Sequence, residues 1–397
     1  MKTNQRVRRA RRLTAITAAG MSAALVLAGC DASATGTDGP IVLGGVFSKS
    51  PVPFGNDAEE TAMQVFKDVN ADGGIDGREI KYTTSDDQSD TTKAGSGARD
   101  AVSDDAVAMV GSASFVDCGT NKALYHKKEI MSIQAVGVDP TCFNSPDIAS
   151  VTISPYTQLT ANMYYASEEL GDDDVCLFQP TTPGSEEAIE KAIDRWEDMT
   201  GNSLLIDDHS IPQKQTKFTN ELLRAKSKEC DAIVYGGGDN VAAPMLKNAA
   251  NQGMADVDFL YVSVAYTEQL AEAAGDLGMN VYATTGTYPF TSEDETTKPW
   301  RETATAAGAN QTSFSEAGYI AANWIVDVLR GMDEPISRES VTEALKDGGE
   351  YDSDLVSTPL VFGSGDSHDR TSGMTVMKIE DGEWAEEQQL DLPDSEQ

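Results

Sequence analysis

Apolar residues along this chain fall into short runs that alternate with segments of helical periodicity. The first run, Ile41-Val42-Leu43-Gly44-Gly45-Val46-Phe47, lies between Pro40 and a Ser/Pro cluster, as a strand buried on both faces would. The next segment carries an apolar stripe at helical spacing, formed by Ala62, Val65, Phe66 and Val69. Gly73-Gly74 ends that helix, and residues 79–82 begin a second strand. In such a unit, ligands meet the loop after the first strand, here residues 47–55.

The same alternation continues along most of the chain. Further strands are predicted at residues 107–110, 130–133, 175–178, 204–206, 231–235, 259–262 and 281–283. Amphipathic runs such as 186–199 and 218–225 separate them, which predicts an α/β fold of parallel strands with helices on both faces of each sheet. A helix is expected at about 314–329, and the alternation in residues 355–383 favours an antiparallel excursion.

The amino-terminal residues have the pattern of a targeting segment. Residues 1–29 combine a basic start, an apolar stretch too short for a typical bilayer span, and Leu27-Ala28-Gly29 just before Cys30. This tetrapeptide resembles a bacterial lipobox, which implies cleavage before Cys30 and lipid attachment to it. Arg11-Arg12 is compatible with twin-arginine export as well as general secretion. Residues 30–40 are expected to form a flexible tether.

Size and charge narrow the classes of function. The roughly 360 residues that remain exceed what one core usually supports, so we expect two lobes. Asp and Glu outnumber Lys and Arg by 65 to 30, giving a formal charge of −35. Nucleic acid and anionic lipid surfaces are poor partners for such a chain, and dispersed acidic residues are typical of a solvated surface.

Motifs for catalysis and metal binding are weak. Ser367, His368 and Asp369 are adjacent, but a catalytic triad needs side chains brought together by the fold, so we predict a solvated turn at 365–369. Residues 68–79 match the ligand spacing of an EF-hand, yet residues 79–83 predict a strand where an EF-hand needs a helix. With no Walker loop, HExxH, complete GxGxxG or CxxC, we expect no enzyme activity, no metal and no cofactor.

Several motifs together carry a resemblance to one family. They are Pro53-Phe54-Gly55, residues 68–77, residues 86–90 with Lys93-Ala94, Gly111, Asp139-Pro140, Tyr235-Gly236-Gly237 and Gly318-Tyr319. In these the chain resembles the solute-binding proteins of branched-chain amino acid ABC transporters. The resemblance implies a type I periplasmic-binding fold, with two Rossmann-like lobes joined by hinge crossings and a solute between them. It places one lobe at 41–154 plus 285–345 and the other at 155–284 plus 346–390.

The resemblance also implies a set of solute-binding residues in the first lobe. Phe54 matches an aromatic residue that covers an apolar part of the solute. Phe115, flanked by Ser114 and Asp117, takes the place of a serine that holds a carboxylate, which removes a donor and adds stacking surface. The next loop supplies Gly137 and Asp139.

In the second lobe the resemblance marks Thr182, Asp239 and Tyr266 as candidate contacts. An acidic residue that would hold an α-ammonium group aligns near Ala265-Tyr266 and is missing. Asp239 and Asp117 are candidates to replace it, since a carboxylate in a dry cleft pairs strongly with a cation. Each is also explained as a helix cap or a first-turn charge.

Cysteines other than Cys30 number four, Cys118, Cys142, Cys176 and Cys230, as suits an oxidising compartment. Four cysteines allow three connectivities, which sequence alone does not separate. We favour Cys118 with Cys142 and Cys176 with Cys230, because each pair would then lie within one lobe.

Taken together, these features predict the solute-binding component of an ABC importer, lipid-anchored to the outer face of the cell membrane. It would be a monomer that captures an amino acid or a related amide or aromatic compound and delivers it to permease and ATPase subunits. The alternatives are a sensing lipoprotein of the same fold and an extracellular hydrolase.

Overall fold

A computed structural model describes residues 39–182, 184–348 and 350–393. The predicted signal peptide and Cys30 lie outside these residues. Strands form a five-stranded and a seven-stranded sheet, and no helix among the described residues is long and apolar enough to cross a membrane.

The first sheet is entirely parallel, in the order β2-β1-β3-β4-β5. Its strands are β1 (Ile41–Phe47), β2 (Ile80–Asp86), β3 (Ala108–Ala113), β4 (Ser132–Val136) and β5 (Ile148–Ser150). All seven residues of β1 are buried, because helices cover both faces of the sheet. The strand, helix and strand predicted for the opening unit are confirmed, and residues 72–79 form a turn into β2 and not into a helix.

The second sheet has the order β12-β11-β10-β9-β8-β6-β7. Its strands are β6 (Val175–Pro180), β7 (Ile206–Ile211), β8 (Ala232–Tyr235), β9 (Asp258–Tyr261), β10 (Asn280–Thr285), β11 (Met374–Glu380) and β12 (Glu383–Leu390). Strands β6 to β10 are parallel, whereas β11 and β12 join the β10 edge as an antiparallel hairpin. The predicted α/β class is confirmed. The antiparallel segment, predicted over residues 355–383, begins later, at Met374.

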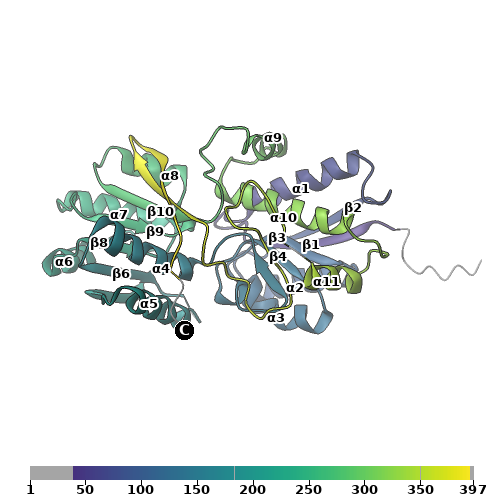
Figure 1. Cartoon of the computed structure of the whole chain (residues 1–397), viewed down its shortest axis with the longest axis horizontal. Coiled ribbons are helices and arrows are strands. Elements are labelled where there is room, and N and C mark those ends of the chain that lie inside the picture. Colours follow the sequence, from purple (N-terminus) through teal and green to yellow (C-terminus); the bar gives the residue numbers. More distant parts are fainter. Residues whose placement is uncertain (1–38, 183, 349, 394–397) are drawn as a thin grey trace, which may run out of the picture. The chain divides into compact units, whose positions relative to one another are not determined.

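Helices connect the strands and cover the sheets (Figure 1). They are α1 (Asn56–Ala71), α2 (Thr91–Ser103), α3 (Asp117–Lys128), α4 (Pro155–Tyr164), α5 (Glu186–Thr200), α6 (Thr219–Lys228), α7 (Asp239–Asn251), α8 (Glu268–Gly275), α9 (Lys298–Ala307), α10 (Ser313–Arg330) and α11 (Arg338–Asp347). Three short helical turns are η1 (Pro140–Cys142), η2 (Tyr165–Leu170) and η3 (Ser263–Ala265).

Helix α10 returns from the second sheet and packs beside α1 on the first (Figure 1). The two helices approach closely at Gly318, where an added Cβ would lie 2.3 Å from the carbonyl oxygen of Ala58. Their first turns are also tied together, since Asp57 accepts hydrogen bonds from the Asn310 side chain (3.0 Å) and the Thr312 hydroxyl (3.2 Å). Both helices therefore begin at the same place, at the carboxyl ends of β1 and β3.

Two disulfides hold loops to this framework. Cys118 at the start of α3 bonds to Cys142 in η1, and Cys176 in β6 bonds to Cys230 just before β8. This is the pairing that the sequence favoured, and each bond joins segments that belong to one sheet and its covering helices.

Residues 351–370 contact segments of both sheets. The His368 backbone N–H donates to Phe143 O, and its ring nitrogen Nδ1 lies 2.8 Å from Ile148 O. Asp369 accepts hydrogen bonds from Ser154 N and Thr157 Oγ1 at the start of α4. The predicted solvated turn is therefore wrong for His368 and Asp369, because long-range packing buries much of both side chains. The predicted lobe boundaries stay predictions.

An acidic group lies at the amino-terminal edge of the second sheet. Burial, followed by the charge of Asp258, raises the pKa of Asp172 to about 7. The pKa of Asp258, the first residue of β9, is also raised, chiefly by burial. A carboxyl group with a raised pKa in the folded state binds more protons there than in the unfolded chain.

We predict that Gly318→Ala destabilises the protein by about 1–3 kcal/mol, because the new methyl group overlaps the Ala58 backbone and α10 must move away from α1. Urea unfolding followed by circular dichroism measures the change. Gly365→Ala is the matched control, since its Cβ would make only ordinary contacts. Equal stabilities for the two variants would contradict the close approach.

We predict that Asp172→Asn is more stable than the wild type above pH 7 and that the two converge near pH 4. The unfolded pKa is about 3.9, so wild-type stability falls as pH rises from about 4 to 7 and the native carboxyl loses its proton. Melting temperatures across this pH range test the claim, with the exposed Asp276→Asn as the control. A difference that does not depend on pH would refute it.

Candidate functional site

Three helices and two loops meet at the carboxyl edge of the first sheet. The loop after β1 is fixed to the end of β3 by the Ser48 N–H, which donates to Ala113 O at 3.0 Å. The same loop closes on itself when the Gly55 N–H donates to Ser48 O at 2.9 Å. Helices α1, α3 and α10 begin beside these loops. Open parallel sheets bind ligands at this edge, so it is the candidate site.

A buried carboxylate, Asp87, organises the start of α3. The Ser48 hydroxyl donates to its Oδ1 at 2.7 Å, and the Ser114 hydroxyl donates to its Oδ2. The Ser114 oxygen also accepts the N–H groups of Val116 (3.0 Å) and Asp117 (2.9 Å), while the Phe115 N–H donates to the Ser48 oxygen at 3.2 Å. The N–H groups of residues 115–117 are thus already bonded within the protein. Ser114, a predicted solute contact, is used internally.

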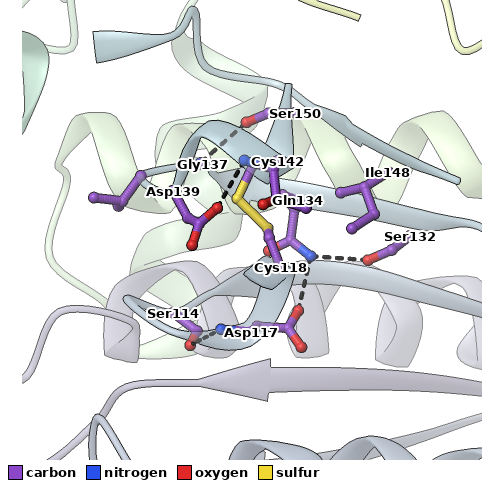
Figure 2. The surroundings of a disulfide bond; sticks show 12 residues. Ser114, Asp117, Cys118, Ser132, Gln134, Gly137, Asp139, Cys142, Ile148 and Ser150 are labelled. Carbon is purple, nitrogen blue, oxygen red and sulfur yellow. Dashed lines mark hydrogen bonds between the residues drawn. A yellow bond between two sulfur atoms is a disulfide. The ribbon is translucent and has the colours of Figure 1, made fainter. Parts of the chain in front are cut away.

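Asp117 is fully buried under α3 and not at the edge (Figure 2). Its carboxylate accepts hydrogen bonds from Asn121 (2.7 Å), Tyr125 (2.8 Å) and Gln134 (2.9 Å). Burial raises the pKa of Asp117, and these donors offset part of the rise. The carboxylate predicted as a cation anchor is instead the centre of a structural network.

The loop that carries Gly137 and Asp139 is likewise held by the protein itself (Figure 2). The Gly137 N–H donates to Ser150 Oγ at 3.0 Å, and a Cβ at this position would lie 2.6 Å from the Phe143 ring. Asp139 caps η1 by accepting the Thr141 N–H at 2.7 Å. The Gly137 N–H and the Asp139 carboxylate are therefore both bonded within the protein. These contacts direct neither group toward the carboxyl edge.

Three aromatic side chains gather at the edge, and we call them the aromatic cluster: Phe54, Phe115 and Phe314. Phe54 stacks on Phe115 with ring centroids 4.2 Å apart and is tilted against Phe314 at 5.1 Å. Phe54 is nearly buried, whereas Phe115 is 37% exposed. The structure therefore brings together two predicted contacts. Phe314, in the first turn of α10, was not predicted, because the sequence shows only that a helix begins near it.

The predicted contacts of the second sheet follow three of its strands, β6, β8 and β9. Thr182 is partly exposed, and its hydroxyl donates to Pro180 O at 3.4 Å. Asp239 lies in the first turn of α7 and accepts the Thr267 hydroxyl at 3.0 Å. Tyr266 is buried, and its ring centroid lies 4.6 Å from that of Phe290 and 5.1 Å from that of Trp384.

Glu316 is a further acidic residue that the prediction missed. It is the fourth residue of α10 and fully buried, and neither carboxyl oxygen has a hydrogen-bond partner among the described residues. Burial raises its pKa well above the usual range, and the nearby Thr287 hydroxyl, which lowers the pKa, does not meet hydrogen-bonding geometry. A signal was present, since Glu316 lies four residues before Ile320 on the apolar face of the helix.

The two-sheet architecture and a ligand edge on parallel strands define a solute-binding α/β fold. Residues 42–383 match the family model described as periplasmic binding protein, and the chain belongs to this family. No curated protein matches the chain.

Solved structures share the fold at low identity. The branched-chain amino acid transporter substrate binding protein LivJ from Streptococcus pneumoniae, in complex with isoleucine, is 20% identical with a TM-score of 0.74, over 88% of this chain and 99% of that one. A solute binding protein from R. palustris in complex with 4-hydroxybenzoate is 16% identical with a TM-score of 0.72, over 90% and 98%. A fatty acid ABC transporter substrate-binding protein from Thermomonospora curvata is 19% identical with a TM-score of 0.74, over 89% and 94%.

We predict that Ser114→Ala lowers stability by about 1–3 kcal/mol, because it leaves Asp87 short of a donor and two N–H groups of α3 without an acceptor. Denaturant unfolding measures the loss. Ser103→Ala, at an exposed position of α2, serves as the control. If both variants unfold at the wild-type midpoint, Ser114 is not the internal cap described here.

Proposed function

We propose that this protein is the extracytoplasmic solute-binding component of an ABC importer. The observation that carries the proposal is the aromatic cluster, placed at the carboxyl edge of the first sheet in a chain of the periplasmic binding protein family. Aromatic faces bind apolar and planar groups through a large contact area with few rotatable bonds. An amino acid, or a related amide or aromatic compound, fits such a surface.

Capture would use two lobes, residues 41–154 plus 285–345 and residues 155–284 plus 346–390. The solute would bind between them and stabilise the closed arrangement, since a ligand shifts a population toward the state that it binds better. Permease and ATPase subunits would then accept the loaded form. The N–H groups of residues 115–117 are already bonded, so these three would not hold a solute carboxylate.

Attachment to the membrane would be through a lipid on Cys30 after removal of residues 1–29. The mature protein would act as a monomer on the outer face of the cell membrane. It would bind its solute without chemical change, because Ser367 contacts Asn144 whereas His368 contacts Ile148 O, so the adjacent Ser, His and Asp do not converge on one another.

We predict that one class of solute raises the melting temperature of the unlipidated protein in a screen of amino acids, amides, short peptides, aromatic acids and sugars. Binding only to the folded state adds about 2.7 kcal/mol at a hundredfold excess over Kd. Phe115→Ala should weaken that solute about threefold to tenfold by calorimetry, since it removes an exposed aromatic face.

Leu223→Ala, an exposed apolar residue on α6, is the matched control and should bind as the wild type does. No stabilisation by any class would contradict a solute-binding role. Equal affinities for Phe115→Ala and Leu223→Ala would move the site away from the aromatic cluster.

A further inference from the structure

Polar groups near the carboxyl edge fall into two contrasting sets. The N–H groups of residues 115–117 are bonded to Ser48 and Ser114, whose hydroxyls are in turn directed at the Asp87 carboxylate. A solute carboxylate placed on these three N–H groups would have to displace their bonds beside the buried Asp87.

The second set consists of buried oxygen atoms that have no hydrogen-bond partner among the described residues. Glu316 is 0% exposed, and both of its oxygens lack partners in the part of the chain that the structure describes. The Tyr266 hydroxyl is also buried and without a hydrogen-bond partner there. Burial raises the pKa of that phenol, and the charge of Glu316 adds to the rise. A buried polar group without a partner is rare in folded proteins and calls for a missing one.

The position of Glu316 connects it with both halves of the protein. It projects from α10, which packs on the first sheet, and it lies close to Thr287, just beyond the end of β10 in the second sheet. Tyr266 follows η3, which comes directly after β9 of the second sheet. Phe314 of the aromatic cluster also lies in the first turn of α10, so this end of the helix supplies both residues. The neighbours of Glu316 thus come from segments of both sheets.

We propose that Glu316 and the Tyr266 phenol form the polar end of the solute site, and that the solute presents an N–H donor, an ammonium or amide group, to Glu316. This inference rests on the proposed function and narrows its solute class. The aromatic cluster would cover the apolar part of the same solute. A donor placed on Glu316 restores hydrogen bonds that the empty site lacks, and a charged partner makes those bonds stronger.

The other two candidate anchors already have partners within the protein. Asp117 accepts three hydrogen bonds, from Asn121, Tyr125 and Gln134, and is fully buried under α3. Asp239 accepts the Thr267 hydroxyl and lies in the first turn of α7, where a negative charge is stabilised by the helix itself. Glu316 has no such partner, which makes it the acceptor that a solute can complete.

The test uses four probes of similar size: benzylamine, benzamide, leucine amide and benzoate. Calorimetric titration of the unlipidated wild-type protein should give tighter binding for an amine or amide probe than for benzoate. Glu316→Gln should weaken the best amine or amide probe about tenfold or more, because a neutral amide replaces the carboxylate acceptor. Tyr266→Phe, which keeps the packed ring and removes only the hydroxyl, should weaken the same probe less.

The matched control is Glu302→Gln, which removes an exposed carboxylate from α9. It should bind every probe as the wild type does. Glu316→Gln should also fold with unchanged or raised stability without probe, because burial favours the neutral form of this group. That comparison separates a lost contact from a misfolded variant.

Three results would overturn the inference. In the first, the wild-type protein binds benzoate more tightly than any amine or amide probe. In the second, none of the three N–H probes binds. In the third, Glu316→Gln binds the probes with the same affinities as Glu302→Gln. Each of these leaves the solute-binding role intact as long as some class of solute stabilises the protein in the broader screen. The absence of any binding solute in that screen would instead remove the proposed function itself.

Discussion

The close contact between α1 and α10 is the constraint on which the candidate site depends. Helix α10 follows β10 of the second sheet, yet it lies against α1 with Gly318 on the backbone of Ala58. A side chain at that position would separate the helices. Since Asp57 also joins the starts of the two helices, Phe314 arrives beside Phe54, and the first turns of α10 also hold the buried Glu316. A long-range backbone contact thus assembles a site from segments more than 250 residues apart.

Electrostatic balance at the edge distinguishes this protein from the pattern implied by its family resemblance. A serine hydroxyl and free N–H groups at the start of α3 would favour a solute carboxylate. Here Phe115 replaces that serine, and the Ser48 and Ser114 hydroxyls, which donate to Asp87, accept the N–H groups of residues 115–117. Negative charge is therefore held inside the protein at one end of the site, and an acceptor stands without a partner at Glu316. Both changes favour a solute that donates hydrogen bonds.

Much of the fold could be predicted from the sequence because it depends on local patterns. The continuous apolar run of β1, the stripe of α1 and the glycine-rich turn before β2 determine their structure within a few residues. The disulfide pairing followed from placing each pair within one lobe. Phe54 and Phe115 were predicted from the family resemblance, and the structure brings their rings together.

The rest of the site depends on side-chain direction and distant packing, which spacing alone does not give. Asp117 and Phe115 both follow β3. Asp117, however, is the first residue of α3, and its side chain points inward and accepts a hydrogen bond from Gln134. From the sequence, Glu316 is one more residue of a regular helix. Its burial near Thr287 and Tyr266 depends on packing between distant segments, which only the structure reveals. His368 and Asp369 stand in a polar stretch, yet segments more than 200 residues earlier bury much of both.

The most direct measurement is a crystal structure of the protein with its best-binding amine or amide. The account predicts that the solute lies on the aromatic cluster, with a nitrogen within hydrogen-bond distance of a Glu316 oxygen, and that the N–H groups of residues 115–117 keep their bonds to Ser48 and Ser114. A solute held by its oxygen atoms at the start of α3, with Glu316 still without a partner, would contradict it.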